Sequence, residues 1–202
     1  MITYRKAKES DDVAAFIYGA APELFEYTFS HSALAFLAHD FNRKKGIFGS
    51  DWMVVAVSEN RPIGTLTMYP GSRVTSLALT TLITILRFYS LIEVFGILKR
   101  LLKIAPLFLK PSGDCVFIAN GFIHEDYRKP GVFTGLVELA EKRAHEDGLS
   151  AIECDISERN TVSLEVHKFL GFTAMCKTDA GDDPRLAGFV RMRLSLNPSE
   201  SI

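Results

Sequence analysis

The sequence predicts an α/β protein built on one mixed sheet of about seven strands, with helices flanking the sheet. Three observations support this fold class. Two apolar strands around a short polar turn indicate a hairpin at 52–69, strands and amphipathic helices alternate after Pro111, and 48% of the residues are hydrophobic. A chain of 202 residues with this composition can bury a sizeable core as one domain, without disulfides or structural metals.

The first half of the chain predicts a strand, two short helices and the hairpin. Residues 2–7 alternate weakly between apolar and polar side chains and indicate a strand. The pattern is helical from 13 to about 39, with a break at Pro22, because proline lacks a backbone donor and interrupts a helix. The hairpin strands are expected at 52–57 and 64–69.

Residues 71–113 read as an apolar insertion between the hairpin and the second half. Apolar residues recur there at spacings of 4, 3 and 4, at Leu91, Phe95, Leu98 and Leu102. This spacing predicts an amphipathic helix with one apolar stripe. A membrane-spanning helix needs about 20 consecutive apolar residues, and charged residues from Arg87 onward interrupt the run too early. We therefore expect a pair of packed helices, and a membrane partner is disfavoured.

The second half predicts four strands and two helices in alternation. The strands are expected at 115–123, 149–156, 172–178 and 189–196. Asn120 and Gly121 predict a bulge in the first of them, since glycine within a strand often marks one. In the last strand, apolar residues from Val190 onward alternate with Arg191, Arg193 and Ser195, which predicts one buried and one solvent-facing side. We expect a single domain at 1–198 and a tail at 199–202.

Charge and cysteine content exclude several classes of protein. The chain has 23 Lys and Arg against 24 Asp and Glu, which argues against nucleic-acid binding, because phosphate contacts need a basic excess. Cys115, Cys154 and Cys176 are far apart and predict neither a disulfide framework nor a metal site. His124 has no second ligand cluster to share a metal with. The charged N-terminal residues do not form a signal peptide, and a cytoplasmic protein is expected.

The loop at 127–135 is a candidate phosphate site. It lies between an expected strand and helix, and the first N–H groups of a helix lack intrahelical partners and carry the positive end of its dipole. Arg128 and Lys129 would add positive charge. The loop lacks the GKS/T ending of a Walker loop and the GxGxxG dinucleotide fingerprint. Taken alone, the loop fits an ordinary strand-to-helix turn with solvated basic residues better than it fits a phosphate site.

A second block changes this balance. Residues 160–172 (NTVSLEVHKFLGF) follow the next expected strand. Together with the loop they resemble the GNAT superfamily of acyl-CoA-dependent N-acyltransferases. In that superfamily a strand ending V-x-P-x-Y-R precedes G-x-G-[IV]-G-x-x-L, and N-x-x-A-x-x-L-Y-x-K-x-G-F follows the next strand. Residues 123–128 (IHEDYR) resemble the first part, and residues 129–133 (KPGVF) resemble the loop. The last part is matched at Asn160, Ser163, Val166, His167, Leu170, Gly171 and Phe172. The ordered combination over about 115–176 resembles this superfamily.

The chain departs from the family pattern at three places. Phe133 stands where the family usually has Gly or Ala, which predicts a loop that is bulkier against a pyrophosphate. His167 replaces the usual Tyr. The insertion at 71–113 is far longer than the connection between the third and fourth strands of the minimal fold, and it resembles a branch with a helical insertion at this place.

The resemblance implies a GNAT fold whose sheet is splayed between strands 4 and 5, with acetyl-CoA in the resulting cleft. The backbone of Phe122 and Ile123 would pair with the pantetheine arm as an added strand does. The pyrophosphate would be bound by the loop, at Arg128, Lys129, Pro130, Gly131, Val132, Phe133 and Thr134. Asn160 and Ser163 complete the implied cofactor-binding set, although Asn160 is also expected to cap its helix.

By the same resemblance, an amine attacks the thioester directly in a ternary complex. His167 would protonate the departing thiolate, since an ordinary histidine pKa near 6.5 suits that role. The alternative is a helix-surface histidine packed beside Phe169 and Phe172, without chemistry. No general base is assigned, because Glu23, Glu26 and Asp155 are more typical of solvated or structural carboxylates.

Two functions therefore stay open. The chain is expected to be an N-acetyltransferase for a small-molecule or peptide amine, or else a non-catalytic module that binds coenzyme A or a protein or membrane partner through the insertion. The insertion holds six cations against Glu93 and would form a lid for an apolar or anionic acceptor, or a packing surface. We favour the packing surface, with self-association into a homodimer, because an exposed apolar stripe must be covered.

Overall fold

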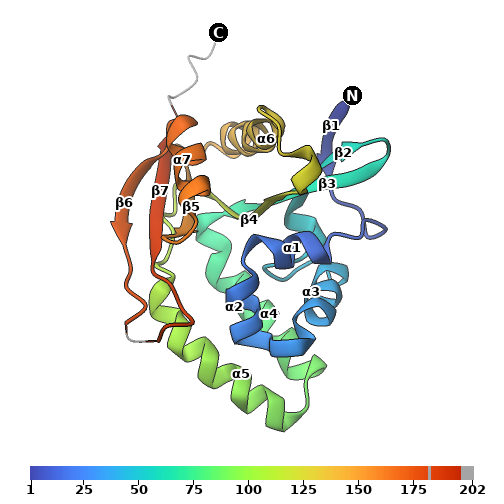
Figure 1. Ribbon diagram of the computed structural model, residues 1–202, viewed down its shortest axis with the longest axis vertical. Coiled ribbons are helices and arrows are strands. Elements are labelled where there is room, and N and C mark those ends of the chain that lie inside the picture. Colours follow the sequence, from blue (N-terminus) through green and yellow to red (C-terminus); the bar gives the residue numbers. More distant parts are fainter. Residues whose placement is uncertain (182, 197–202) are drawn as a thin grey trace.

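The computed structural model describes residues 1–181 and 183–196 and shows a seven-stranded sheet flanked by helices (Figure 1). The strands are β1 (Ile2–Lys6), β2 (Met53–Ser58), β3 (Arg61–Pro70), β4 (Cys115–Ile123), β5 (Ala151–Ser157), β6 (Thr173–Lys177) and β7 (Phe189–Ser195). The α-helices are α1 (Ala14–Ala20), α2 (Pro22–Phe29), α3 (Ala33–Asn42), α4 (Val74–Phe88), α5 (Leu91–Ile104), α6 (Val132–Glu146) and α7 (Thr161–Phe169). The predicted tail at 199–202 lies outside the described residues.

The sheet is mixed, as predicted, and consists of two antiparallel halves. Its strand order is β1-β2-β3-β4-β5-β7-β6. Strands β1 to β4 pair antiparallel with one another, and so do β5, β7 and β6. The halves are joined by the parallel pair β4–β5. The β2–β3 turn has positive φ angles at Glu59 (49°) and Asn60 (64°), the conformation that two-residue hairpin turns favour.

Helices α1, α2 and α3 cover one face of the β1–β4 half. Ile17, Phe36 and Leu37 are completely buried there and pack in one cluster with Val55 and its neighbours on β2. The predicted break at Pro22 is confirmed, since Pro22 is the first residue of α2. The sequence did not predict the second break, at Ser30, where a positive φ of 53° ends α2 before α3 begins.

Helix α6 packs on the other face and forms the largest core cluster with both halves of the sheet. The predicted spacing is confirmed, because Val137, Ala140 and Ala144 are buried and Phe133 is partly buried against the same cluster. The cluster includes Val116 and Ile118 of β4 and Ile152 of β5, among others. Helix α6 therefore holds the two halves of the sheet together across the β4–β5 junction.

The insertion is a pair of packed helices, α4 and α5, as predicted, and most of the predicted apolar stripe of α5 is exposed. Leu91, Phe95 and Leu102 are 86%, 75% and 75% exposed. The buried side chains are instead Val94, Ile97 and Ile104. The prediction of a single apolar stripe was wrong, because α5 is apolar on two faces and a second set of residues meets the core.

Strand β7 also differs from its prediction, because Arg191 is 6% exposed and does not face solvent. Its guanidinium donates to Asp155 Oδ1 and Oδ2, to Glu153 Oε2 and to the carbonyl of Leu109. Arg193 donates to Glu153 Oε1 at 2.6 Å. A buried charge must be paired, and β5 supplies both carboxylates directly beside β7.

Candidate functional site

The two halves of the sheet separate along β4 and β5. These strands pair over three positions only, from Cys115 opposite Ala151 to Phe117 opposite Glu153. Beyond that point β4 continues to Ile123 and β5 continues to Ser157, but the two strands no longer pair with each other in the described part of the chain. The sequence-predicted splay between the fourth and fifth strands is thus present, and Figure 1 shows the two strands diverging beneath α6 and α7.

The predicted bulge in β4 is present at the point of divergence. The register with β3 shifts between Thr65 and Thr67, which face Phe122 and Ala119, so β4 carries one additional residue. Asn120 has a positive φ of 51°, and its side chain donates to Thr67 Oγ1 at 3.3 Å. A bulge bends its strand and increases the local twist, which turns the end of β4 away from β5.

The free edge of β4 presents the amide of Ile123. His124 donates its N–H to the Ile63 carbonyl at 2.8 Å. Because successive amides along a strand point to opposite sides, the N–H groups of His124 and Phe122 both point to β3. The N–H of Ile123 therefore points away from β3, into the gap. The Ile123 carbonyl accepts a bond from Arg128 Nε at 3.1 Å. Of the two residues predicted to pair with a ligand, only Ile123 turns its N–H to the gap.

The start of α6 lies next to this edge and carries unpaired amide donors. Gly131 precedes the helix with a left-handed φ of 92°, a conformation that glycine adopts without steric cost. The N–H groups of Lys129 and Val132 are used within the loop, and Pro130 has none. Within the described residues no hydrogen bond engages the N–H groups of Gly131, Phe133 or Thr134. Three of the predicted loop residues therefore offer donors at the positive end of the helix dipole.

Tyr4 of β1 fixes this loop, a role that the sequence analysis missed. Its hydroxyl donates to the Gly131 carbonyl at 3.3 Å. Gly135 makes room for the Tyr4 ring, because a Cβ at position 135 would lie 2.3 Å from Tyr4 Cζ. Gly135 was the available signal in the sequence. It does not identify Tyr4, which is 127 residues from Gly131.

The Phe133 ring points inward, toward the gap between β4 and α7. It lies 3.0 Å from the position that a Cβ on Gly121 would take and 5.2 Å, between ring centroids, from His167. The sequence analysis expected the Phe133 side chain to lie against a pyrophosphate, but its ring packs against the bulge of β4. A Cβ at position 121 would contact that ring tightly, so Gly121 leaves room for it.

His167 is buried on the inner face of α7 and is 5% exposed. Its ring lies between Phe133 and Phe172, whose centroid is 5.1 Å away, whereas Phe169 is 90% exposed and points to solvent. The Nδ1 atom is 2.8 Å from the Ser163 carbonyl, which only accepts, so Nδ1 carries a proton. Burial lowers the pKa of His167, although the bond to Ser163 opposes that shift.

Asn160 and Ser163 are bonded to each other at the start of α7. The Asn160 Oδ1 accepts the Ser163 N–H at 3.0 Å, which confirms the predicted helix cap. The carboxylates considered as bases are also engaged. Glu23 pairs with Arg159 at 3.2 Å, and Asp155 pairs with Arg191. Glu26 lies 3.5 Å from the Tyr18 hydroxyl.

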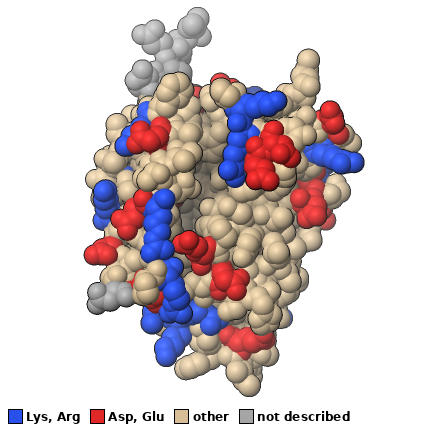
Figure 2. Space-filling model, viewed as in Figure 1, with Lys and Arg blue, Asp and Glu red and all other residues tan. Residues whose placement is uncertain are grey.

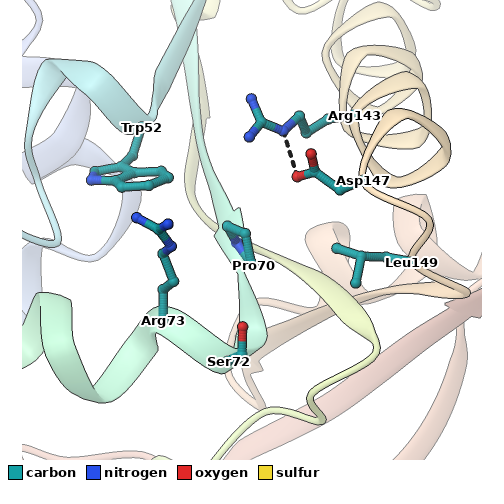
Figure 3. A pocket seen from close by; sticks show the side chains of 7 residues that line it. All are labelled: Trp52, Pro70, Ser72, Arg73, Arg143, Asp147 and Leu149. Carbon is teal, nitrogen blue, oxygen red and sulfur yellow. Dashed lines mark hydrogen bonds and ion pairs between the residues drawn. The ribbon is translucent and has the colours of Figure 1, made fainter.

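A pocket of about 400 Å³ lies at the far end of α6, away from Gly131. It is lined by Trp52, Pro70, Ser72, Arg73, Arg143, Asp147 and Leu149 (Figure 3). Arg143 and Asp147 are paired with each other at 2.7 Å, and the Arg73 guanidinium lies 5.7 Å from the centre of the Trp52 ring. No group of three or more metal-ligating side chains occurs in the part of the chain that the structure describes.

Residues 14–172 match the sequence model of the acetyltransferase (GNAT) family. No curated protein was found to match the chain in sequence. Among solved structures, an N-acetyltransferase from Staphylococcus aureus Mu50 is 17% identical with a TM-score of 0.71, over 95% of this chain and 100% of that one. The apo form of a mutant agmatine N-acetyltransferase is 15% identical with a TM-score of 0.60, over 97% and 100%. A chain of the NatC complex bound to Gag peptide and CoA is 15% identical with a TM-score of 0.55, over 97% and 99%.

Proposed function

The chain belongs to the acetyltransferase (GNAT) family, and from this premise we propose that it transfers an acetyl group from acetyl-CoA to an amine. The observation that carries the proposal is the β4 edge beside three amides at the start of α6, which have no partner among residues 1–181 and 183–196. An extended thioester with a diphosphate at one end is complementary to that arrangement. The amine would attack the thioester carbonyl directly while both substrates are bound.

Acetyl-CoA would lie in the gap with its pantetheine arm along β4 and its pyrophosphate on α6. Ile123 would donate to the arm as an added strand does. The N–H groups of Gly131, Phe133 and Thr134 would bind the phosphate oxygens, and the exposed Arg128 and Lys129 would add charge. The NatC complex bound to Gag peptide and CoA, one chain of which shares this fold, supports the choice of coenzyme A.

Two groups would assist the chemistry. A preorganised N–H stabilises the oxyanion of acyl transfer, and Ile123 supplies the one that faces the gap. His167 is our candidate for the acid that protonates the thiolate. Its Nδ1 proton is held by Ser163, so the proton given would be the one on Nε2 of the charged ring. Burial lowers the pKa of that ring, which makes the proton easier to release but leaves fewer rings charged at neutral pH.

The acceptor would be a small-molecule or peptide amine that enters from the side of α1 and α2. Proteins of this fold are named for different acceptors, agmatine in one and a ribosomal-protein alanine in another. The fold therefore leaves the acceptor open, because function resides in the site and not in the fold. On the sequence evidence we also propose a cytoplasmic location.

The second candidate function is a non-catalytic module that binds coenzyme A or a partner. The observation that favours it is Phe133, whose ring occupies part of the space between Gly121 and His167. The two functions differ in turnover. Calorimetry with acetyl-CoA and an assay for free thiol with a panel of amines separate them, because the module would bind without releasing coenzyme A.

The cofactor assignment is tested by Gly131→Asp, with Gly148→Asp as its matched control. Both glycines have left-handed φ angles, 92° and 65°, and a Cβ at either position would meet no atom within 4 Å. Gly131→Asp places a carboxylate beside the pyrophosphate, and like charges in contact cost several kcal/mol, so affinity for acetyl-CoA should fall roughly a hundredfold or more. Gly148→Asp, at the other end of α6, should bind as the wild type does. Equal affinities in the two variants would refute the assigned phosphate site.

A further inference from the structure

The insertion concentrates the exposed apolar side chains of this protein. Nine of the fifteen large hydrophobic residues that are exposed in the described chain lie between positions 79 and 109. They are Leu79, Ile83, Leu86, Leu91, Ile92, Phe95, Leu102, Phe108 and Leu109. Single exposed apolar residues need no explanation, but a contiguous patch marks an interaction surface.

Helix α5 presents an apolar face to solvent and a second apolar face to the core. Val94, Ile97 and Ile104 pack inward at spacings of 3 and 7. Leu91, Phe95 and Leu102 lie on the outward side at spacings of 4 and 7, and a period of 3.6 residues places Lys99 and Lys103 on that side as well. The outward face is therefore apolar at its centre and carries cations among the leucines.

Exposed apolar residues of α4 precede the corner at which α5 begins. Helix α4 ends at Phe88 and α5 begins at Leu91, so the last turn of one helix meets the first turn of the other. Ile83 and Leu86 of α4 are 41% and 50% exposed there, and Ile92 of α5 is 88% exposed. In Figure 2 the lowest part of the molecule, where α5 lies, is largely free of charged side chains at its tip, and basic side chains gather over the second half of the helix.

The charge of the insertion differs from that of the remainder of the chain. Residues 71–113 hold six Lys and Arg against Glu93, in a protein whose formal net charge is −1. No ion pair within the described residues involves any of these six cations. Elsewhere Arg and Lys form twelve ion pairs, and His124 forms one more. Glu93 is held in a capping box by Ser90, whose hydrogen bonds lower the pKa of Glu93.

The exposed apolar side chains and the unpaired cations of the insertion together favour one binding partner. A second copy docked on the same face, which the sequence favoured, would place the cations of both insertions in one interface with only Glu93 of each insertion as an acid, because a two-fold interface joins identical patches. An anionic lipid surface meets both needs at once, since its headgroups attract the cations and its acyl boundary accepts the apolar side chains. Lysine stems lie along apolar surface while the ammonium reaches the phosphates, as Lys99 and Lys103 could do beside Phe95.

We propose that the α4–α5 surface, defined by Leu79, Ile83, Leu86, Leu91, Ile92, Phe95, Lys99, Leu102 and Lys103, binds an anionic membrane surface. The helices would lie in the plane of the interface and not cross it. None of the helices described here has the length and apolarity needed to span a bilayer. Acetylation would then occur at the membrane surface, although lipid binding does not depend on the proposed acetyl transfer.

The test is cosedimentation of the purified protein with vesicles. We expect binding to vesicles of equal parts phosphatidylcholine and phosphatidylglycerol, and little binding to phosphatidylcholine alone. Lys99→Gln with Lys103→Gln should weaken binding by about fivefold per cation, since each cation near such a surface contributes about that factor. Phe95→Glu should weaken it roughly tenfold or more by removing an inserted ring and adding a like charge.

Phe169→Glu is the matched control, because Phe169 is a helix-surface phenylalanine that is 90% exposed and lies on α7. It should bind vesicles as the wild type does. Equal binding to the two vesicle types, or no binding to either by the folded wild type, would overturn the proposal. So would a wild-type dimer that Phe95→Glu converts to a monomer, since the surface would then be covered by a second copy.

Discussion

The helices that follow β4 and β5 begin in opposite ways. At the start of α7 the Asn160 side chain accepts the Ser163 N–H at 3.0 Å. At the start of α6 Gly131 has no side chain, and no bond within residues 1–181 and 183–196 engages the N–H of Gly131, Phe133 or Thr134. A side-chain cap stabilises a helix by about 1 kcal/mol, so α6 forgoes a stabilisation that α7 has. The difference lies at the third helical residue of each helix. Within the described residues the Asn160 cap engages the N–H of Ser163, whereas the N–H of Thr134 has no partner and is available to a ligand.

Within this comparison, the largest effect on affinity for acetyl-CoA is expected when one amide is removed from the start of α6. Thr134→Pro deletes a free N–H in the first turn of α6, where proline is tolerated. A hydrogen bond to a charged group contributes about 1.5–3 kcal/mol, so affinity for acetyl-CoA should fall roughly tenfold to a hundredfold. Calorimetry measures the loss, and circular dichroism checks that the helix content is kept.

The equivalent change in α7 is Ser163→Pro, at the same position relative to the helix start. It deletes the N–H that Asn160 accepts, so the variant should lose stability and retain most of its acetyl-CoA affinity. If the two proline variants lost affinity equally, the contrast between the helix starts would not hold.

A smaller effect is expected for Asn160→Ala. Loss of the cap costs about 1 kcal/mol, which lowers Tm by about 2–4 °C in a chain of this length. Affinity for acetyl-CoA should stay within a factor of two. A larger fall in affinity would show that Asn160 also contacts the cofactor arm, as the family resemblance implies.

The smallest effect concerns pH and His167. Its folded pKa lies below the ordinary value of 6.5 because the ring is buried. The unfolded chain therefore takes up a proton before the folded one does, and stability falls as pH drops below about 6.5. His167→Gln should remove this part of the loss, so its Tm should fall less than that of the wild type between pH 7.5 and 5.5. A parallel fall in both proteins would contradict the assignment.

Much of the fold was predictable because its signals are local. Pro22 marked the start of α2, Asn120 and Gly121 marked the bulge, and Asn160 marked a cap. Each of these residues acts on its own backbone or on a neighbour within a few positions. The splay came from the family resemblance and the strand order was not predicted, since local patterns do not report which strands pair.

The parts that could not be predicted depend on distant partners. Arg191 looked solvent-facing until Glu153 and Asp155 of β5 were placed beside it. The exposed side of α5 is as apolar as its buried side, so only packing on α2 and the core decides between them. In the site, the loop motif predicted a phosphate-binding role for every residue from 128 to 134, but internal bonds and Pro130 leave three free amides.

The three-position contact between β4 and β5 has a consequence for folding. Four strands on one side and three on the other are each complete antiparallel units, joined by a short parallel seam and by α6. A ligand that lies along β4 in the gap would act as a removable strand between the two units. Unfolding should therefore be more cooperative with the gap filled, and hydrogen exchange along the later residues of β5 should slow when the ligand binds.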